Sequence, residues 1–196
     1  PLPEIVTIAK RYDAILMVDD AHATGVFGKQ GKGMIEHCGL EGKIDIVMGS
    51  LSKAVGSIGG FIAGSKPLID FLKNKARPFI YTTALPPAVC AASMAGLTLI
   101  QEDVSLIDTL WKNIAFLKSR LSTFMDTIAG ESPIVPLIVG SAEDAVNLST
   151  KLYQNGILIP AIRPPTVPPG TSRLRISLMA THSADDINRL IDILQY

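Results

Sequence analysis

The chain has 196 residues, 47% of them apolar, and its 18 basic residues balance its 18 acidic ones. This apolar content is sufficient for a hydrophobic core and excludes a disordered chain. The balanced charge argues against a protein that binds nucleic acid or another polyanion.

The two cysteines, Cys38 and Cys90, are too few for a disulfide framework or a four-cysteine zinc site. We interpret them as reduced thiols, which predicts a cytoplasmic protein. The sequence shows no secretory signal. Residues 78–101 carry no charge, but Pro86 and Pro87 interrupt this stretch. It therefore predicts a buried helix over 88–100 and no association with a membrane.

The chain begins Pro1-Leu2-Pro3, with no initiator methionine, and continues at once into an amphipathic segment. We expect it to be a piece of a longer polypeptide. The periodicity of its apolar residues predicts the elements of the first part. In chain order these are a helix over 4–11, strands over 14–18, 44–48 and 60–63, and helices over 67–75, 88–100 and 104–128. The strand over 14–18 is an unbroken apolar run, which is typical of a strand buried on both faces of a parallel sheet.

The second part, after Gly130, has a different pattern. It predicts strands over 134–139, 157–162 and 174–179 and helices over 142–155 and 184–194. Pro136 favours an edge position for its strand, and Ser183 with Asp186 resembles a capping box. The sequence thus predicts an α/β region over 1–103, a connecting helix over 104–129 and a smaller α+β region over 130–196.

Three residues with reactive side chains follow predicted strands. Asp19 and His22 come directly after the first strand, and Lys53 follows the second. Open α/β sheets bind ligands beyond the carboxyl ends of their strands, so one cleft could contain all three residues. Taken singly, Asp19 could equally be a helix cap or half of a structural ion pair, and His22 an ordinary structural histidine.

Lys53 is the only ionisable residue between positions 46 and 65, and its neighbours are small. Small residues allow a bulky ligand to approach the backbone, and apolar surroundings disfavour the charged form of an amine. An uncharged amine is what a nucleophilic or Schiff-base lysine requires. The alternative is a lysine whose ammonium group reaches solvent from a glycine-rich loop.

An amine opposite a carboxylate is the arrangement that pyridoxal 5′-phosphate (PLP) requires. The lysine binds the aldehyde of the cofactor, and the carboxylate keeps the pyridine nitrogen protonated. Ser50, just before Lys53, supplies a hydroxyl suited to the phosphate group. The sequence therefore predicts PLP as the cofactor.

The motifs at residues 18–25 (VDDAHATG) and 49–56 (GSLSKAVG) resemble those of the α-oxoamine synthases, a branch of the fold-type I PLP enzymes. The segments at 161–168 (AIRPPTVP) and 172–177 (SRLRIS) extend the resemblance toward the C-terminus. The resemblance implies part of the large, mainly parallel-sheet domain of the aspartate aminotransferase-like fold, followed by a small α+β domain.

The resemblance also implies roles for individual residues. Lys53 would be the Schiff-base lysine, Asp19 the partner of the pyridine nitrogen, and His22 a contact of the ring hydroxyl. Ser50 would bind the phosphate, where the family commonly has threonine. Two further roles concern Thr83, which would reach the phosphate of the neighbouring subunit in a homodimer, and Arg175, which would hold the substrate carboxylate. Arg175 could instead be a surface arginine on an edge strand.

Enzymes of this family condense an amino acid with an acyl-CoA and release carbon dioxide. Within the family, the resemblance of the proline-rich segment over 163–169 implies L-alanine and pimeloyl-CoA as substrates and 8-amino-7-oxononanoate, a precursor of biotin, as product. One alternative is the condensation of glycine with acetyl-CoA, as in glycine C-acetyltransferase. Another is a fragment without catalytic activity.

The family's N-terminal half supplies a glycine-rich phosphate loop, a histidine stacked on the cofactor and the first strands of the large sheet. The sequence given begins after these features. We therefore expect the isolated chain to bind PLP poorly and to have no turnover.

Overall fold

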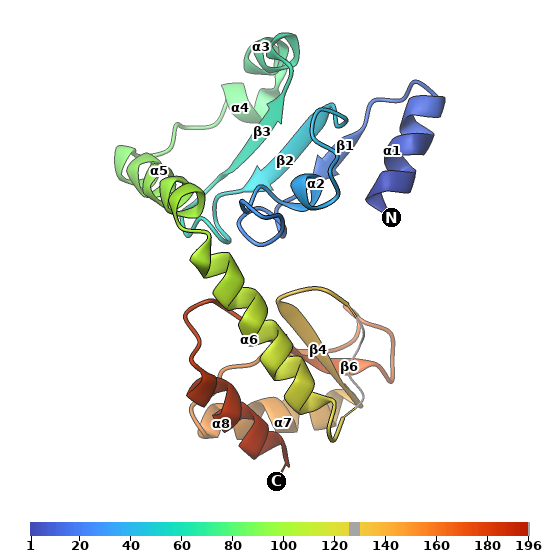
Figure 1. The fold of residues 1–196 in the computed structure, drawn as a ribbon, viewed down its shortest axis with the longest axis vertical. Helices are drawn as coiled ribbons and strands as arrows, with labels where there is room; N and C mark the ends of the chain where they lie inside the picture. The colour runs from blue at the N-terminus through green and yellow to red at the C-terminus, as the bar shows by residue number, and fades with distance from the viewer. Residues whose placement is uncertain (126–129, 196) are drawn as a thin grey trace. The chain divides into compact units, whose positions relative to one another are not determined.

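The computed structural model describes residues 1–125 and 130–195, which form two compact units, Pro1–Ile107 and Asp108–Tyr196. Figure 1 traces the order of their helices and strands. The elements that belong to unit 1 are α1 (Leu2–Arg11), β1 (Met17–Asp19), α2 (Met34–His37), β2 (Ile46–Ser50), β3 (Gly60–Gly64), α3 (Lys66–Lys75), α4 (Arg77–Ile80) and α5 (Pro87–Glu102). The helices expected over 4–11, 67–75 and 88–100 and the strands expected over 44–48 and 60–63 are thus confirmed, with small shifts at their ends. The strand expected over 14–18 is confirmed only in its last two residues. The short helices α2 and α4 were not predicted.

The sheet of unit 1 has the order β1-β2-β3. β1 and β2 run parallel, with Val18 opposite Val47, whereas β3 runs antiparallel to β2, with Ile62 opposite Met48. Parallel β1 and β2 therefore end at the same edge of the sheet, at Asp19 and Ser50.

One face of this sheet carries the apolar core of unit 1. Val18 and Val47 contact a cluster formed by Val6 of α1, Ile35 of α2 and Leu40. Because side chains alternate across a strand, Met17 and Asp19 project from the other face. Met17 is 51% exposed, so the expectation that this strand is buried on both faces is wrong for this chain.

The predicted burial of the helix after the two prolines is also wrong. Within Pro87–Glu102, all of which the structure describes, only Ser93 is buried, and Met94 and Leu99 are more than half exposed. The helix is apolar around most of its circumference, and unit 1 covers only the side that contains Ser93. Within residues 1–125 and 130–195, no helix is both long and apolar enough to span a bilayer.

Unit 2 contains a second sheet, of order β4-β6-β5, with all pairs antiparallel. The chain enters the unit through α6 (Ser105–Leu121). The other elements are β4 (Ile134–Gly140), α7 (Ala142–Gln154), β5 (Ala161–Ile162), β6 (Ser172–Ser177) and α8 (Ala184–Gln195). β4 lies at an edge, as Pro136 predicted. The strand expected over 157–162 is confirmed only in its last two residues.

The core of unit 2 lies between its helices and one face of its sheet. Leu137 of β4 and Leu174 of β6 are opposite one another and fully buried, as are Leu117 of α6, Leu152 of α7 and Ile191 of α8. Alternation along β6 directs its arginines to the opposite face from Leu174.

The connecting helix is shorter than predicted. α6 ends at Leu121, and the predicted continuation over 126–128 lies outside the described residues. The hydroxyls of Ser122 and Thr123 donate hydrogen bonds to the carbonyl oxygens of Ser119 and Arg120, 3.0 and 2.7 Å away. Such local side-chain bonds compete with the backbone bonds of a helix and favour its end.

The capping box predicted for the last helix is confirmed. The amide and the hydroxyl of Ser183 donate to the Asp186 carboxylate, and the Asp186 amide donates back to the Ser183 hydroxyl. Hydrogen bonds from the Ser183 amide and then from its hydroxyl hold the pKa of Asp186 below its ordinary value.

We expect Asp186→Asn to lower the free energy of unfolding at neutral pH. Because the folded-state pKa is below the unfolded value, the stabilisation by Asp186 is present above the unfolded pKa and is lost as the pH falls through the folded pKa. The difference in unfolding free energy between Asp186→Asn and the parent chain should therefore disappear in acid. Ser183→Ala, which removes the other half of the capping box, should lower the unfolding free energy by about 1 kcal/mol at neutral pH. Urea unfolding between pH 2 and 7 measures both effects, with Asp185→Asn on the same helix turn as control. A constant difference across this range would contradict the expectation.

Candidate active site

A pocket of about 890 Å³ opens where β1 and β2 end. Four of the residues predicted from the sequence line it: Asp19, His22, Ser50 and Lys53. Asp19 and Met48 are register neighbours on β1 and β2, and Ile62 of β3 is opposite Met48. All three line the pocket, which therefore lies on the face of the sheet opposite the apolar core of unit 1.

The predicted cleft at the carboxyl ends of two parallel strands is therefore present. The turn after β1 is stabilised by Asp19, whose Oδ1 accepts a hydrogen bond of 3.0 Å from the amide of Ala21. This turn also brings His22 to the pocket, although His22 itself is exposed.

The loop that carries Lys53 is fixed at several points. The Leu51 amide donates to the Gly59 carbonyl oxygen, and the Gly56 amide donates to the Lys53 carbonyl oxygen. The Ser57 hydroxyl donates to the Val89 carbonyl oxygen of α5 and accepts a bond of 2.9 Å from the Ser93 hydroxyl. These contacts give Lys53 a defined backbone position at the rim of the pocket.

Lys53 is exposed, so the expected apolar enclosure of its amine is wrong for this chain. The reason is local, because neighbours as small as Ser52 and Ala54 cannot cover a long side chain. Ser50 is partly buried, and its hydroxyl shares a 2.8 Å hydrogen bond with the hydroxyl of Ser52. The hydroxyl thus belongs to the last residue of β2, and the amine belongs to the short segment that follows it.

The carboxylate buried behind this pocket is that of Asp20, whereas Asp19 is exposed. Asp20 is 2% exposed, and its Oδ1 accepts a hydrogen bond of 3.1 Å from the amide of Met34. Burial raises the pKa of Asp20, the Met34 bond lowers it and the charge of Asp19 raises it further. Sequence reasoning missed Asp20. Side chains alternate along a strand, so Asp20, two residues after Val18, is expected to point inward on the same face.

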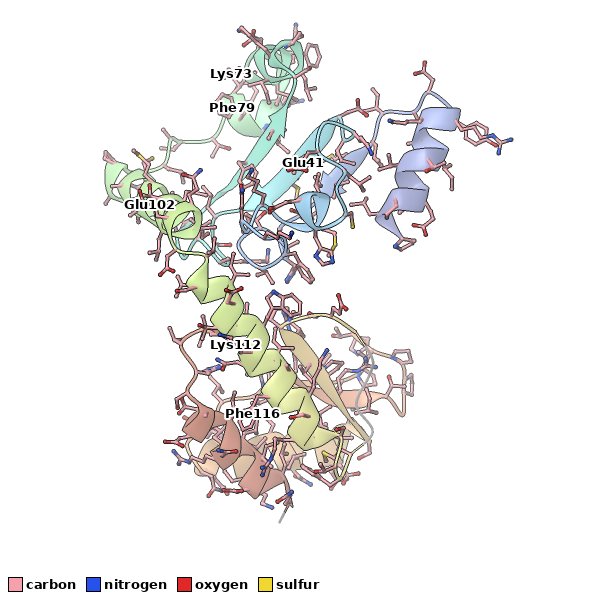
Figure 2. All side chains as sticks on the ribbon, in the orientation of Figure 1. Glu41, Lys73, Phe79, Glu102, Lys112 and Phe116 are labelled. Carbon is pink, nitrogen blue, oxygen red and sulfur yellow. The ribbon has the colours of Figure 1, made fainter. Side chains whose placement is uncertain are left out.

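The opposite wall of the pocket is apolar and was not predicted. Its residues come from β3, α3 and α4 and include Phe61, Ile69, Leu72 and Phe79, with Lys73 as a second lysine. Figure 2 labels Lys73 and Phe79 on the two helices.

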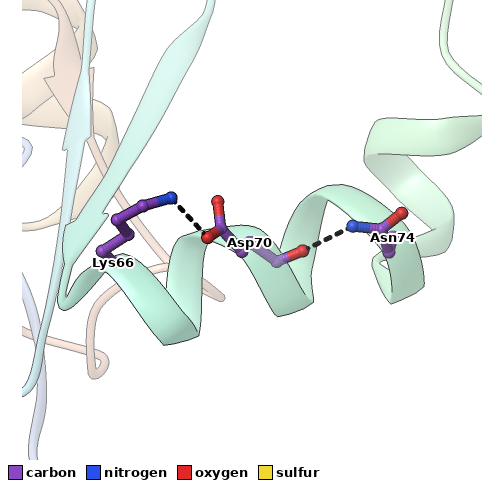
Figure 3. Close-up of polar contacts among 3 residues, drawn as sticks. All are labelled: Lys66, Asp70 and Asn74. Carbon is purple, nitrogen blue, oxygen red and sulfur yellow. Dashed lines mark hydrogen bonds and ion pairs between the residues drawn. The ribbon is translucent and has the colours of Figure 1, made fainter.

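The other side of α3 is polar. Lys66 pairs with Asp70 at 2.6 Å, and the Asn74 side chain donates to the Asp70 carbonyl oxygen at 2.8 Å (Figure 3). Such exposed pairs contribute little to stability.

Two predicted site residues do not line this pocket. Thr83 lies in the exposed segment between α4 and α5. Arg175 belongs to unit 2, where it is exposed on β6 and lines a separate pocket of about 480 Å³ together with His182 and Arg189.

Known proteins are similar to this chain over nearly its whole length. The family profile "Aminotransferase class I and II" matches residues 1–194. The 8-amino-7-oxononanoate synthase of Methylobacillus flagellatus is 48% identical over 196 residues, which cover 99% of this chain and 49% of the relative. The chain spans about half the length of the curated relatives it matches.

Two solved structures have the same fold. Serine palmitoyltransferase from S. paucimobilis, with bound PLP and myriocin, is 33% identical with a TM-score of 0.93, over 100% of this chain and 50% of that one. The 8-amino-7-oxononanoate synthase of Francisella tularensis is 30% identical with a TM-score of 0.83, over 97% of this chain and 56% of that one.

These matches confirm the predicted aspartate aminotransferase-like fold and the resemblance to α-oxoamine synthases. The pocket beyond β1 and β2 and the profile match over residues 1–194 lead to one assignment. The chain belongs to the aminotransferase class I and II family.

Proposed function

We propose that this chain is part of a PLP-dependent 8-amino-7-oxononanoate synthase, a cytoplasmic enzyme that condenses L-alanine with pimeloyl-CoA. The observation that carries the proposal is the gathering of Lys53, Asp19, His22 and Ser50 in one pocket at the ends of two parallel strands. The name of the relative that is 48% identical supports the choice of substrates. The free thiols of Cys38 and Cys90 support the cytoplasmic location.

The residues of the pocket fit PLP in their chemistry. An amine, a carboxylate, an imidazole and a hydroxyl are the groups needed for its aldehyde, its ring nitrogen, its ring hydroxyl and its phosphate. Apolar walls from Met48, Phe61 and Ile62 suit the faces of an aromatic ring. When bound, PLP supplies an electron-withdrawing ring that stabilises negative charge at the α-carbon of an attached amino acid.

The side chains of the chain then have distinct tasks. The Lys53 amine would bind the aldehyde of the cofactor, and its Nζ would accept the α-proton of L-alanine. The Asp19 carboxylate keeps a proton on the ring nitrogen, and His22 orients the ring through its hydroxyl. The Ser50 hydroxyl, which shares a hydrogen bond with Ser52, would bind the phosphate. The guanidinium of Arg175 would bind the substrate carboxylate through two hydrogen bonds.

Thr83 belongs to a segment suited to an interface between subunits of the complete protein. Tyr81 is 78% exposed, and Ile80 and Leu85 are more than 40% exposed on either side of it. Exposed apolar groups in such a cluster are typical of interaction surfaces. They support a homodimer in which Thr83 contacts the phosphate bound by the other subunit.

Reductive labelling tests the proposed function on the 196-residue chain. The chain is incubated with PLP, reduced with borohydride and digested, and the pyridoxyl group is located by mass spectrometry. We expect most of the label on Lys53, with little on Lys73 of the same pocket or on Lys75, and we expect L-alanine to reduce labelling more than glycine does. Label spread evenly over the exposed lysines would contradict the proposal.

A further inference from the structure

The buried carboxylate of Asp20 has no task in the proposed chemistry. It follows Asp19 directly and precedes His22 by two residues, so it is the inward-facing member of the turn that lines the pocket. Its Oδ2 is buried and has no hydrogen-bond partner among the residues that the structure describes. Burial of a carboxylate without a full set of hydrogen bonds costs free energy of folding. We therefore ask which parts of the backbone the carboxylate holds in position.

The backbone of Asp20 already joins three segments. Its amide donates a 2.8 Å hydrogen bond to the Met48 carbonyl oxygen of β2. Its carbonyl oxygen accepts bonds of 2.9 Å from the amides of Ala23 and Thr24 and one of 3.1 Å from the Thr24 hydroxyl. The turn that contains His22 is therefore built on the main chain of Asp20.

The side chain of Asp20 fixes this turn from behind. Oδ1 accepts a hydrogen bond from the amide of Met34, the first residue of α2. Oδ2 lies so close to Gly33 that a Cβ on that residue would overlap it. Gly33 in turn donates its amide to the Phe27 carbonyl oxygen. Thus one carboxylate ties the strand end that bears Asp19 to the bend before α2.

We propose that Asp20 is a positioning residue for the cofactor site: its hydrogen bond to the Met34 amide holds the turn from Asp19 to Thr24 so that Asp19 and His22 line the pocket. The inference rests on the proposed function only for the identity of the ligand, PLP. The raised pKa of Asp20 agrees with a carboxylate kept in this buried place for its geometry.

Glu36 provides a matched control in the same loop. Its carboxylate accepts hydrogen bonds from the amides of Gln30 and Lys32, and it does not line the pocket. Like Asp20, Glu36 thus holds a bend of this loop through hydrogen bonds from backbone amides to its carboxylate. A merely structural role would make Asp20 and Glu36 equivalent in their effect on PLP binding.

The test compares Asp20→Ala, Asp20→Asn, Met34→Pro and Glu36→Ala with the parent chain, by titration with PLP followed by absorbance. Asn keeps an acceptor for the Met34 amide, whereas Met34→Pro removes that amide at a helix position where proline is tolerated. We expect Asp20→Ala and Met34→Pro to weaken PLP binding by about tenfold or more, and Asp20→Asn and Glu36→Ala to stay within about threefold.

Amide hydrogen exchange gives a second measurement that needs no cofactor. We expect the Ala23 and Thr24 amides to exchange about tenfold faster in Asp20→Ala and Met34→Pro, whereas in Glu36→Ala the faster amides are those of Gln30 and Lys32. If the amides exchange as expected but the chain forms no PLP complex even at saturating PLP, the proposed function is contradicted and the positioning of the turn remains supported. Parental exchange at Ala23 and Thr24, equal loss of PLP binding in Glu36→Ala, or an Asn variant as weak as the Ala variant would overturn the positioning role.

Discussion

Replacing Lys53 with alanine is expected to abolish the absorption band that the chain develops with saturating PLP. The band requires a covalent bond between the cofactor aldehyde and an amine, and alanine has none. We assign this role to Lys53 because its loop is fixed by the bond from the Leu51 amide to Gly59 and by the bond from the Ser57 hydroxyl to α5, and because Lys53 lines the pocket. Asp19 and His22 line the same pocket. Difference absorbance at equal protein and PLP concentrations measures the loss.

Lys73→Ala is the matched control, since Lys73 is the other lysine that lines the pocket. It should keep the band at parental intensity because its helix, α3, lies on the apolar wall and not at the strand ends. A band that survives in Lys53→Ala and disappears in Lys73→Ala would move the cofactor to the opposite wall. It would also remove the basis for the roles of Asp19 and Ser50.

The elements of both units could be predicted largely from local patterns. The apolar run ending at Val18 and the run ending at Met48 gave strands whose parallel pairing places Asp19 and Lys53 near one another. Ser183 with Asp186 gave a helix start that the hydrogen bonds confirm. These features depend on residues close in sequence, so their physics is visible in the sequence alone.

Burial was predicted less well because it depends on which surfaces meet. The apolar residues of α5 and the exposed face of β1 have the composition of a core, yet Met94 and Met17 are exposed in the structure. The apolar wall with Phe61 and Phe79 was missed because it requires β3 to turn back antiparallel to β2 before α3 and α4 follow. Such an arrangement is set by tertiary packing and not by periodicity.

Within the candidate site, the sequence identified the groups that face the pocket and missed the one behind it. Asp19 and Asp20 are chemically identical neighbours, and only the alternation of the strand distinguishes them. Val18 contacts the apolar cluster of unit 1, so Asp20, two residues on, shares its inward face. The Met34 amide, which donates a hydrogen bond to the Asp20 carboxylate, lies fourteen residues away, beyond the reach of a local pattern.

Gly33→Ala is expected to destabilise unit 1 by about 2–6 kcal/mol. Gly33 has φ 100° and ψ −165°, a region essentially restricted to glycine, where another residue costs about 1–3 kcal/mol. In addition, the new Cβ would overlap Oδ2 of Asp20, and relieving an overlap in a packed interior costs about 1–3 kcal/mol more. Urea unfolding followed by far-UV circular dichroism measures the sum.

Gly42→Ala separates the two contributions. Gly42 also has a positive φ of 72°, but a Cβ there would meet nothing within 4 Å, so only the conformational cost of about 1–2 kcal/mol applies. Asp20→Ala removes the oxygen that the new Cβ would overlap. The loss of unfolding free energy in the double variant Asp20→Ala/Gly33→Ala should therefore be at least about 1 kcal/mol smaller than the sum of the losses in the two single variants. Additive costs would show that Asp20 and Gly33 are not in contact. The carboxylate would then not hold the bend before α2, and the turn that carries Asp19 and His22 would need another anchor.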